Sequence, residues 1–432
     1  MIPETPLPFQ ETVPPRTPEA TARLAWLVLG VATCCFCALC ALVGYGLWQY
    51  RANKMGPQGG NYLEVFAGPV SLIGAVDVRP VTISQGQRVP LQEGETVVVG
   101  KGTPPGVAAL VMLWDGSTLQ LSAGTRVTFS HLRVTRYSSR RQEVVMEVSQ
   151  GRVLLGVSPL QRYQQTDFFL SVAGVRVQLE PGGTYLLRIG DGAEVAVRAG
   201  RAQALPRSDG IPVSLEAGQK VLIRPDQSVA VEAARWELLR NGDFAQGTAD
   251  CQAIDGWTFR LQAGRTDTVP PVCRRVEQQI DAQPVWAVLL ERSGANRDRV
   301  VATGILFQEM AEEVSFYQSV RLEFDLRIDY QSLPGGGDLG IYYPFAVRIH
   351  YRDARGNGQR YTYGFYYRTE PGYLTEMEDG EAILFRHDYP VRWQHFSLDL
   401  QKLEPTVLTG IELVASGHDY TSFVANVALV AE

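Results

Sequence analysis

Three basic side chains and one tyrosine form the set of residues best suited to bind a ligand. Arg348, His350 and Arg352 alternate along one predicted strand and therefore lie on one face of it. Tyr366 falls on the same face of the next predicted strand. A sugar-binding site combines an aromatic ring with hydrogen-bond donors and acceptors, which these side chains supply. We predict ligand binding there, against the simpler interpretation of a solvated outer sheet with a cation–π pair.

The two strands that carry these residues are predicted from their alternation. Residues 345–352 and 360–367 flank a turn at 355–358. Pairing Tyr351 with Tyr361 places the apolar row of one strand beside the aromatic row of the other, whereas a one-residue slip would break that match. The hairpin is therefore predicted with one buried face and one exposed face, and the four candidate residues lie on the exposed one.

The sequence contains no pattern typical of catalysis or of a resident metal ion. Its five histidines show no metal-ligand spacing with cysteines or carboxylates. It has no nucleophile elbow, phosphate-binding loop or dinucleotide fingerprint, and nothing pairs two carboxylates for glycoside hydrolysis. The net charge of −6 lacks the electrostatic footprint of nucleic-acid binding. We therefore predict a protein that is not an enzyme, with no catalytic residues and no metal site, and with no nucleic-acid partner.

One stretch, Leu24 to Trp48, is suited to contact membrane lipid. Its 25 residues include no charged side chain and no histidine, and Arg23 and Arg51 bound it. At about 1.5 Å per helical residue it spans the roughly 30 Å hydrocarbon core of a bilayer with some tilt. The alternative is a cleaved signal peptide, whose apolar core is normally about 7–15 residues long. Because this run is longer, we predict an uncleaved transmembrane helix.

The segments that flank the helix differ in composition from the rest of the chain. Residues 1–23 contain six prolines and no apolar periodicity, so a disordered tail is predicted. Residues 49–70 are predicted as a linker, polar and Gly-rich at their start. Taken alone, Arg51 and Lys54 would place the part of the chain beyond the helix in the cytoplasm by the positive-inside rule.

Cysteine usage bears on the cellular compartment. Four of the six cysteines lie within the apolar helix, where they are expected to be ordinary small, packable residues. Cys251 and Cys273 are the remaining pair, and in an oxidising compartment they could form a disulfide. In the cytoplasm the same pair would stay reduced.

Residues 71–233 alternate short apolar runs with glycine-centred turns. Four turns share a Leu-x-x-Gly phrase, ending at Gly94, Gly124, Gly182 and Gly218. Each phrase ends one predicted strand and allows a positive φ before the next strand begins. Repetition without a constant period predicts an all-β domain, an irregular sandwich or a short solenoid.

Short glycine-containing motifs follow one another along this domain. Asp115-Gly-Ser-Thr-Leu-Gln-Leu121 and Gly124-Thr-Arg-Val127 come first, and Gly151-Arg-Val153, Gly183-Thr-Tyr185 and Gly200-Arg-Ala202 follow. In this order they resemble the core motif and the later motifs of the FecR family. The resemblance implies a single-span protein with its β domain outside the cytoplasm. Classical members control a sigma factor through a cytoplasmic helical domain. The Pro-rich tail is too short to form such a domain, so sigma-factor control is not expected.

Residues 234–432 resemble carbohydrate-binding, galactose-binding-like jelly rolls. Leu238-Leu-Arg-Asn-Gly-Asp-Phe244, then Gly256-Trp257, is similar to the opening of those domains, and Phe423-Val-Ala-Asn-Val427 is similar to their final strand. The resemblance implies a β-sandwich that recognises sugars. Many such folds hold a structural calcium with their first and last strands. Ala245 and Ala425 stand where the family motif has acidic residues, which leaves that ion doubtful.

These features together predict an all-β ectodomain, a FecR-like sandwich or solenoid followed by a jelly roll, behind one N-terminal transmembrane helix. The two resemblances and the cysteine pair place the ectodomain outside the cytoplasm, against the flank charges. The predicted function is non-catalytic binding or scaffolding in the cell envelope, with a glycan as the candidate ligand. Two alternatives stay open: a single-span signalling receptor of FecR type, and a structural subunit of an envelope assembly with protein partners.

Overall fold

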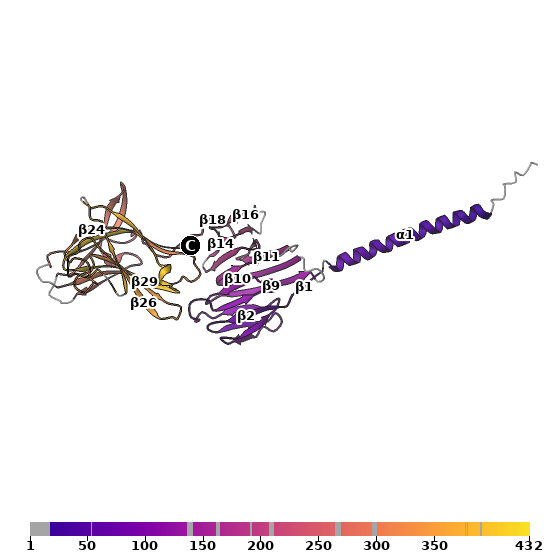
Figure 1. The fold of residues 1–432 in the computed structure, drawn as a ribbon, viewed down its shortest axis with the longest axis horizontal. Helices are drawn as coiled ribbons and strands as arrows, with labels where there is room; N and C mark the ends of the chain where they lie inside the picture. The colour runs from indigo at the N-terminus through magenta and orange to yellow at the C-terminus, as the bar shows by residue number, and fades with distance from the viewer. Residues whose placement is uncertain are drawn as a thin grey trace, which may run out of the picture.

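The computed structural model contains one long helix followed by two β domains in a row (Figure 1). It describes residues 18–52, 54–135, 141–160, 165–190, 192–206, 211–263, 269–295, 300–375, 377, 379–388 and 391–432. We call residues 55–233 the proximal domain and residues 234–432 the distal domain. The all-β fold class behind one N-terminal apolar helix is thereby confirmed.

Helix α1 (Pro18–Ala52) extends away from both domains (Figure 1). Its segment Arg23–Tyr50 is long and apolar enough to cross a membrane, judged by length and composition. The helix begins before Leu24 and includes Pro18–Arg23, which the sequence had assigned to the disordered tail. Proline suits this first helical position because its missing N–H would have no intrahelical partner there. Residues 1–17 of that tail lie outside the described residues.

The proximal domain begins at Met55, so the predicted linker 49–70 is wrong over most of its length. Strand β2 (Asn61–Val65) alternates buried and half-buried side chains, with Leu63 and Val65 fully buried. The apolar alternation of these few residues was hidden by the glycines that precede them. The strands of the domain are β1 (Met55–Pro57), β2, β3 (Val70–Ile73), β4 (Pro80–Ile83), β5 (Arg88–Leu91), β6 (Thr96–Val99), β7 (Ala109–Met112), β8 (Thr118–Leu121), β9 (Arg126–Thr135), β10 (Arg141–Gly156), β11 (Gln165–Val172), β12 (Val175–Leu179), β13 (Thr184–Ile189), β14 (Ala193–Ala199), β15 (Arg201–Leu205), β16 (Val213–Glu216), β17 (Gln219–Ile223) and β18 (Val229–Ala233).

Strand β10 belongs to both sheets of the proximal domain. Its first half pairs with β9 and β11, and its second half pairs with β8 and β13. The change occurs at Gly151, whose φ of +94° favours glycine, and a Cβ there would lie 2.4 Å from the Cα of Thr125. The core between the sheets is made of alternating aliphatic side chains from nearly every strand. The second sheet, which contains β13, β14 and β17, faces the distal domain.

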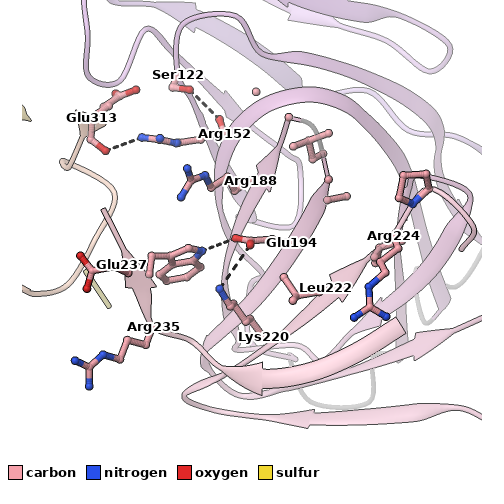
Figure 2. Close-up of a pocket in the computed structure, with 18 of the residues that line it drawn as sticks. Ser122, Arg152, Arg188, Glu194, Lys220, Leu222, Arg224, Arg235, Glu237 and Glu313 are labelled. Carbon is pink, nitrogen blue, oxygen red and sulfur yellow. Dashed lines mark hydrogen bonds and ion pairs between the residues drawn. The ribbon is translucent and has the colours of Figure 1, made fainter. Parts of the chain in front are cut away.

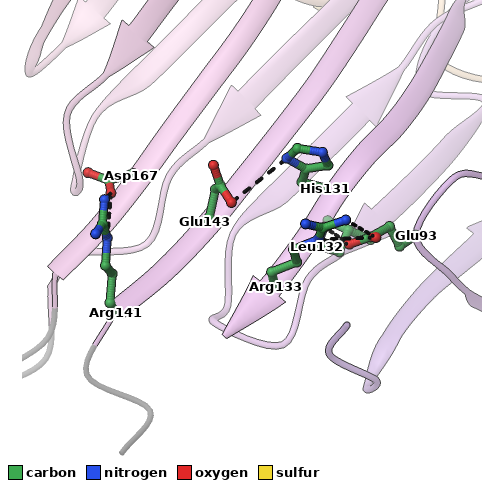
Figure 3. A network of polar contacts seen from close by, with 7 residues as sticks. All are labelled: Glu93, His131, Leu132, Arg133, Arg141, Glu143 and Asp167. Carbon is green, nitrogen blue, oxygen red and sulfur yellow. Dashed lines mark hydrogen bonds and ion pairs between the residues drawn. The ribbon is translucent and has the colours of Figure 1, made fainter. Parts of the chain in front are cut away.

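Ion pairs connect neighbouring strands of the first sheet (Figure 3). Glu93 accepts hydrogen bonds from Arg133 Nη2 at 2.9 Å and from the backbone N–H of Leu132 at 3.0 Å. Arg141 on β10 pairs with Asp167 on β11 at 3.0 Å. The first set of contacts joins the turn between β5 and β6 to β9, and the second joins β10 to β11.

The distal domain is a sandwich of two sheets around one core. One sheet has the order β21-β22-β30-β24-β28, with β19 also paired to β30, and the other has the order β20-β23-β29-β25-β26-β27. The elements are β19 (Trp236–Glu237), η1 (Cys251–Ala253), β20 (Thr258–Ala263), β21 (Val272–Ile280), β22 (Gln283–Arg292), β23 (Ala302–Glu313), β24 (Val320–Gln331), β25 (Phe345–Arg352), β26 (Gly358–Tyr366), β27 (Gly380–Leu384), β28 (Gln394–Asp399), η2 (Gln401–Leu403), β29 (Val407–Gly417) and β30 (Tyr420–Ala431).

The predicted register of the β25–β26 hairpin is wrong by two residues. Ile349, not Tyr351, lies opposite Tyr361. The turn is earlier than predicted because the carboxylate of Asp353 accepts hydrogen bonds from the backbone N–H groups of Arg355 and Asn357, each at 2.9 Å. A shift of two keeps every side chain on its predicted face, because the side-chain period of a strand is two.

Cys251 and Cys273 form a disulfide that ties η1 to β21. Their Cα atoms are 5.5 Å apart, and both residues are buried. The bridge closes the irregular segment between β19 and β20 onto the sandwich. The four cysteines of α1 are free and exposed along the helix surface.

Candidate functional site

Arg348 and His350 lie on the outer face of the β25 sheet, where both contact one carboxylate. Arg348 Nη1 is 3.4 Å from Glu412 Oε2, and His350 Nε2 is 3.3 Å from Glu412 Oε1. The register explains the contact, because Arg348 and Glu412 lie directly opposite each other on β25 and β29. The side chains of Arg348, Glu412 and His350 are 18%, 14% and 31% exposed. We call these three residues the polar row.

The electrostatics of the polar row favour an ionised carboxylate. Burial by itself raises the pKa of Glu412, but its contacts with His350 and Arg348 outweigh it, and the pKa falls below its usual value. Burial also lowers the pKa of Arg348, against the opposing attraction of Glu412. The row therefore presents an acceptor between two donors. A ligand hydroxyl needs this combination, because it both donates and accepts.

An aromatic ring that the sequence did not single out borders the polar row. Phe307 on β23 lies opposite Glu412 in the β23–β29 pairing. Its ring meets the His350 ring edge-on, with centroids 6.1 Å apart, and the Arg260 guanidinium lies 4.5 Å from its centroid. Phe307 and Glu412 come from strands about a hundred residues apart in sequence, so only the sheet order could have brought them together.

Of the other two candidate residues, Tyr366 lies apart from the polar row, whereas Arg352 lies two residues beyond His350 on the same strand. Tyr366 follows Phe365, which lies opposite Phe345, and its ring packs near that of Tyr343 with centroids 6.4 Å apart. Arg352 lies opposite Gly358 at the other end of the hairpin. At about 3.3 Å per residue, Tyr366 and Arg352 are on the order of 26 Å apart along the strands. The four residues share one face but do not form one compact site.

A surface hollow of about 540 Å³ lies at the Arg352 end of this face. It adds the carboxylate of Asp379 and the guanidinium of Arg360 to the donors and acceptors available there. Its lining residues are His350, Tyr351, Arg352, Gly358, Gln359, Arg360, Asp379 and Thr409. His350 thus belongs to both the polar row and the hollow, and the two features form one continuous polar surface.

The jelly-roll resemblance implies a calcium ion held by the first and last strands of the distal domain. Glu237 lies in β19, beside the last strand, where its Oε1 accepts hydrogen bonds from the backbone N–H groups of Leu239 at 3.0 Å and Leu429 at 2.9 Å. That oxygen is therefore already engaged by the protein itself. Nowhere in the described ranges do three or more His, Cys, Asp or Glu side chains group as metal ligands would.

Solved structures are similar to parts of the chain at low identity. A candidate anti-sigma factor from Parabacteroides distasonis is 17% identical, with a TM-score of 0.26, and the match covers 34% of this chain and 68% of that one. A family 61 carbohydrate-binding module in complex with β-1,4-galactotriose is 14% identical, with a TM-score of 0.24, over 46% of this chain and 99% of its own. A family 11 module from Clostridium thermocellum, in complex with a mixed-linked tetrasaccharide, is 8% identical, with a TM-score of 0.24, over 45% and 94%.

No family model matches the chain, and no curated protein matches it. Because the TM-scores of the solved structures are low, the description of the fold rests on the strand pairings given above.

Proposed function

We propose that this chain is a non-catalytic, membrane-anchored protein of the cell envelope that binds a glycan on the outer face of the β25 sheet. The observation that carries the proposal is the polar row of Arg348, Glu412 and His350 beside the ring of Phe307. Forked donors, a fixed acceptor and an adjoining ring are the groups that recognise a sugar.

Partial burial makes the polar row suited to recognition rather than to solvation alone. An exposed ion pair contributes little and samples many geometries, whereas Glu412 and Arg348 are mostly covered by their neighbours. A ligand hydroxyl would therefore meet donors and an acceptor that already hold their positions. Such preorganisation reduces the entropy lost on binding.

The proposed location is outside the cytoplasm, with α1 as the anchor. Support comes from the apolar length of α1, from the two resemblances in sequence and from the Cys251–Cys273 bridge, which persists only in an oxidising compartment. The polar row lies in the distal domain, which follows the proximal domain away from α1 (Figure 1). Such a placement would hold the binding face at a distance from the bilayer.

A glycan array probed with the full chain in nanodiscs tests the proposal. We expect binding to one class of glycan, reduced at least tenfold in Arg348→Ala and in Glu412→Gln, because each substitution removes one or more charge-assisted hydrogen bonds. Arg386→Ala, which removes an 81% exposed arginine from the same domain, is the matched control and should bind as the parent does.

Binding that is equal in the parent and the polar-row variants would place the glycan elsewhere and refute this site. An array without any bound glycan would refute the function. Co-purification with a sigma factor or kinase would then favour the receptor alternative, and a stoichiometric envelope complex would favour the structural one.

A further inference from the structure

The second sheet of the proximal domain packs directly against the distal domain. Leu186 on β13 and Ala196 on β14 are 2% and 0% exposed, and they belong to the same apolar cluster as the core of the distal domain. The rings of Trp236 and Tyr317, from the distal side, have centroids 5.2 Å apart within this cluster. The contact is therefore a small apolar centre with polar residues around it.

A cleft of about 940 Å³ opens beside this contact (Figure 2). Its described lining includes five cationic side chains and three carboxylates. The cations are Arg152, Arg188, Lys220, Arg224 and Arg235, and the carboxylates are Glu194, Glu237 and Glu313. The proximal domain supplies most of the cations, and Trp236 forms part of the wall.

The carboxylates of the cleft are engaged by the protein. Glu194 accepts a hydrogen bond from Trp236 Nε1, and its other oxygen is 3.5 Å from Lys220 Nζ. Glu313 accepts a hydrogen bond from the backbone N–H of Gly106 at 2.7 Å, and burial raises its pKa. Glu237 accepts the two backbone hydrogen bonds already described. Several of their oxygens are therefore occupied by protein donors, and Glu237 and Glu313 also interact electrostatically with Arg235 and Arg152.

Two arginines of the cleft lie directly opposite each other on neighbouring strands. Arg152 of β10 pairs with Arg188 of β13 in the register of the second sheet. Like charges in this position repel, because directly opposite side chains on one face are only about 5 Å apart at Cβ. Arg152 is compensated by Glu312 at 3.0 Å. Arg188 contacts the Tyr317 hydroxyl at 3.4 Å, and on its other side it lies opposite Glu194 of β14, with which it forms no ion pair.

A further arginine near Tyr317, Arg198, lies outside the lining of the cleft. Arg198 interacts electrostatically with Tyr317, and burial lowers its pKa. One of its terminal nitrogens, Nη2, is buried without a hydrogen-bond partner among the described residues, although such groups are normally satisfied. Arg224, which also lines the cleft, is exposed and interacts electrostatically with the carboxylate of Asp226. The repulsion between Arg152 and Arg188, and the excess of cationic over acidic side chains in the lining, favour an anion in the cleft.

We propose that the cleft between the two domains binds a carboxylate, sulfate or phosphate group, held chiefly by Arg188 with Arg224 contributing from the far wall. Arginine forks suit these planar or tetrahedral oxyanions because they donate two hydrogen bonds at once. The source of the anion is either an acidic saccharide or a free inorganic ion. The site is separate from the polar row, and it does not depend on glycan binding there.

Calorimetric titration of the full chain in nanodiscs, at low ionic strength, tests the cleft. The probes are sodium sulfate, inorganic phosphate and trigalacturonate, with uncharged galactotriose as the neutral control. We expect saturable binding of at least one anion, weakened about tenfold or more in Arg188→Gln, since charge-assisted hydrogen bonds are lost. Arg188→Lys should recover part of the affinity, and Arg386→Gln should leave it unchanged.

The pattern across probes identifies the source of the anion. Binding of trigalacturonate alone assigns an acidic saccharide, and equal binding of sulfate or phosphate assigns a free anion. Arg224→Gln, on the exposed side of the cleft, serves if Arg188→Gln fails to fold, and it should also weaken binding. The proposal is overturned if no anion binds saturably, or if folded Arg188→Gln and Arg224→Gln bind as tightly as Arg386→Gln.

Discussion

Replacing Glu412 by glutamine removes the negative charge from the polar row while keeping the shape of the side chain. Arg348 would then lie on a half-buried surface without its counter-charge. Breaking a fully buried ion pair costs about 3–5 kcal/mol, and breaking an exposed one costs about 0–1 kcal/mol. The polar row lies between these limits, since its side chains are 14–31% exposed.

The geometry narrows the expected magnitude. Distances of 3.3 and 3.4 Å are long for charge-assisted hydrogen bonds, which are usually about 2.7–2.9 Å. We therefore expect Glu412→Gln to lower the free energy of unfolding of the distal domain by about 1–2 kcal/mol. For a domain of roughly 200 residues this corresponds to a fall in Tm of about 2–8 °C.

Scanning calorimetry at several pH values measures this effect. The pKa of Glu412 is lowered by folding, so its stabilisation is present above the unfolded pKa, near 4.5, and is lost as the pH falls through the folded pKa. The difference between the parent and Glu412→Gln should accordingly be full at pH 7 and shrink below pH 4.5.

Glu381→Gln is the matched control, because Glu381 and its partner Lys402 are each nearly half exposed. It should change stability by no more than about 0.5 kcal/mol. A Glu412→Gln protein as stable as this control at pH 7, or equally destabilised at pH 7 and pH 3.5, would refute the assignment of the polar row as a partly buried charge cluster.

Three further predictions concern the stability of both domains. Gly364→Ala should lower the free energy of unfolding by about 1–3 kcal/mol in urea titrations, because the new Cβ would lie 2.5 Å from the Tyr343 ring. The control Gly358→Ala has open space around its Cβ and should cost less, so equal effects would contradict this packing. Glu93→Gln should lower the free energy of unfolding by at most about 1 kcal/mol at pH 7 and not at all in acid. The hydrogen bond from Arg133 lowers the pKa of Glu93, so the stabilisation disappears as the pH falls through the folded-state pKa. Thermal melts that show the same loss of stability at every pH would contradict this ion pair. The double variant Cys251→Ser, Cys273→Ser should lower the free energy of unfolding by about 2–4 kcal/mol in urea titrations without reductant, and added dithiothreitol should not change its stability. An unchanged urea midpoint would show that the disulfide does not stabilise the fold.

The strand alternation was sufficient to predict which face each candidate residue occupies. Arg348 and His350 lie on the outer face as predicted, because a two-residue error in register preserves the face of every side chain. The apolar pattern gave no indication of this register error, because both registers place apolar side chains opposite each other. The error arose from Asp353, whose hydrogen bonds start the turn early.

The composition of the site could not be predicted in the same way. Glu412 and Phe307 belong to no sequence motif and lie on strands far from β25 in sequence. Their role depends on the sheet order, which local patterns do not specify. The cleft between the domains was missed for the same reason, because Arg152 and Arg188 become neighbours only through the β10–β13 pairing.

Thiol labelling on intact cells tests the central claim that the binding domains lie outside the cytoplasm. The chain used is a variant whose four helix cysteines are alanine, so that Cys251 and Cys273 are the remaining thiols. With any outer barrier opened, a membrane-impermeant maleimide should label this chain only after a reductant is added, together with enough urea to expose the two buried thiols. Labelling that requires lysis of the cells, and needs no reductant, would place both domains in the cytoplasm and contradict the proposed function.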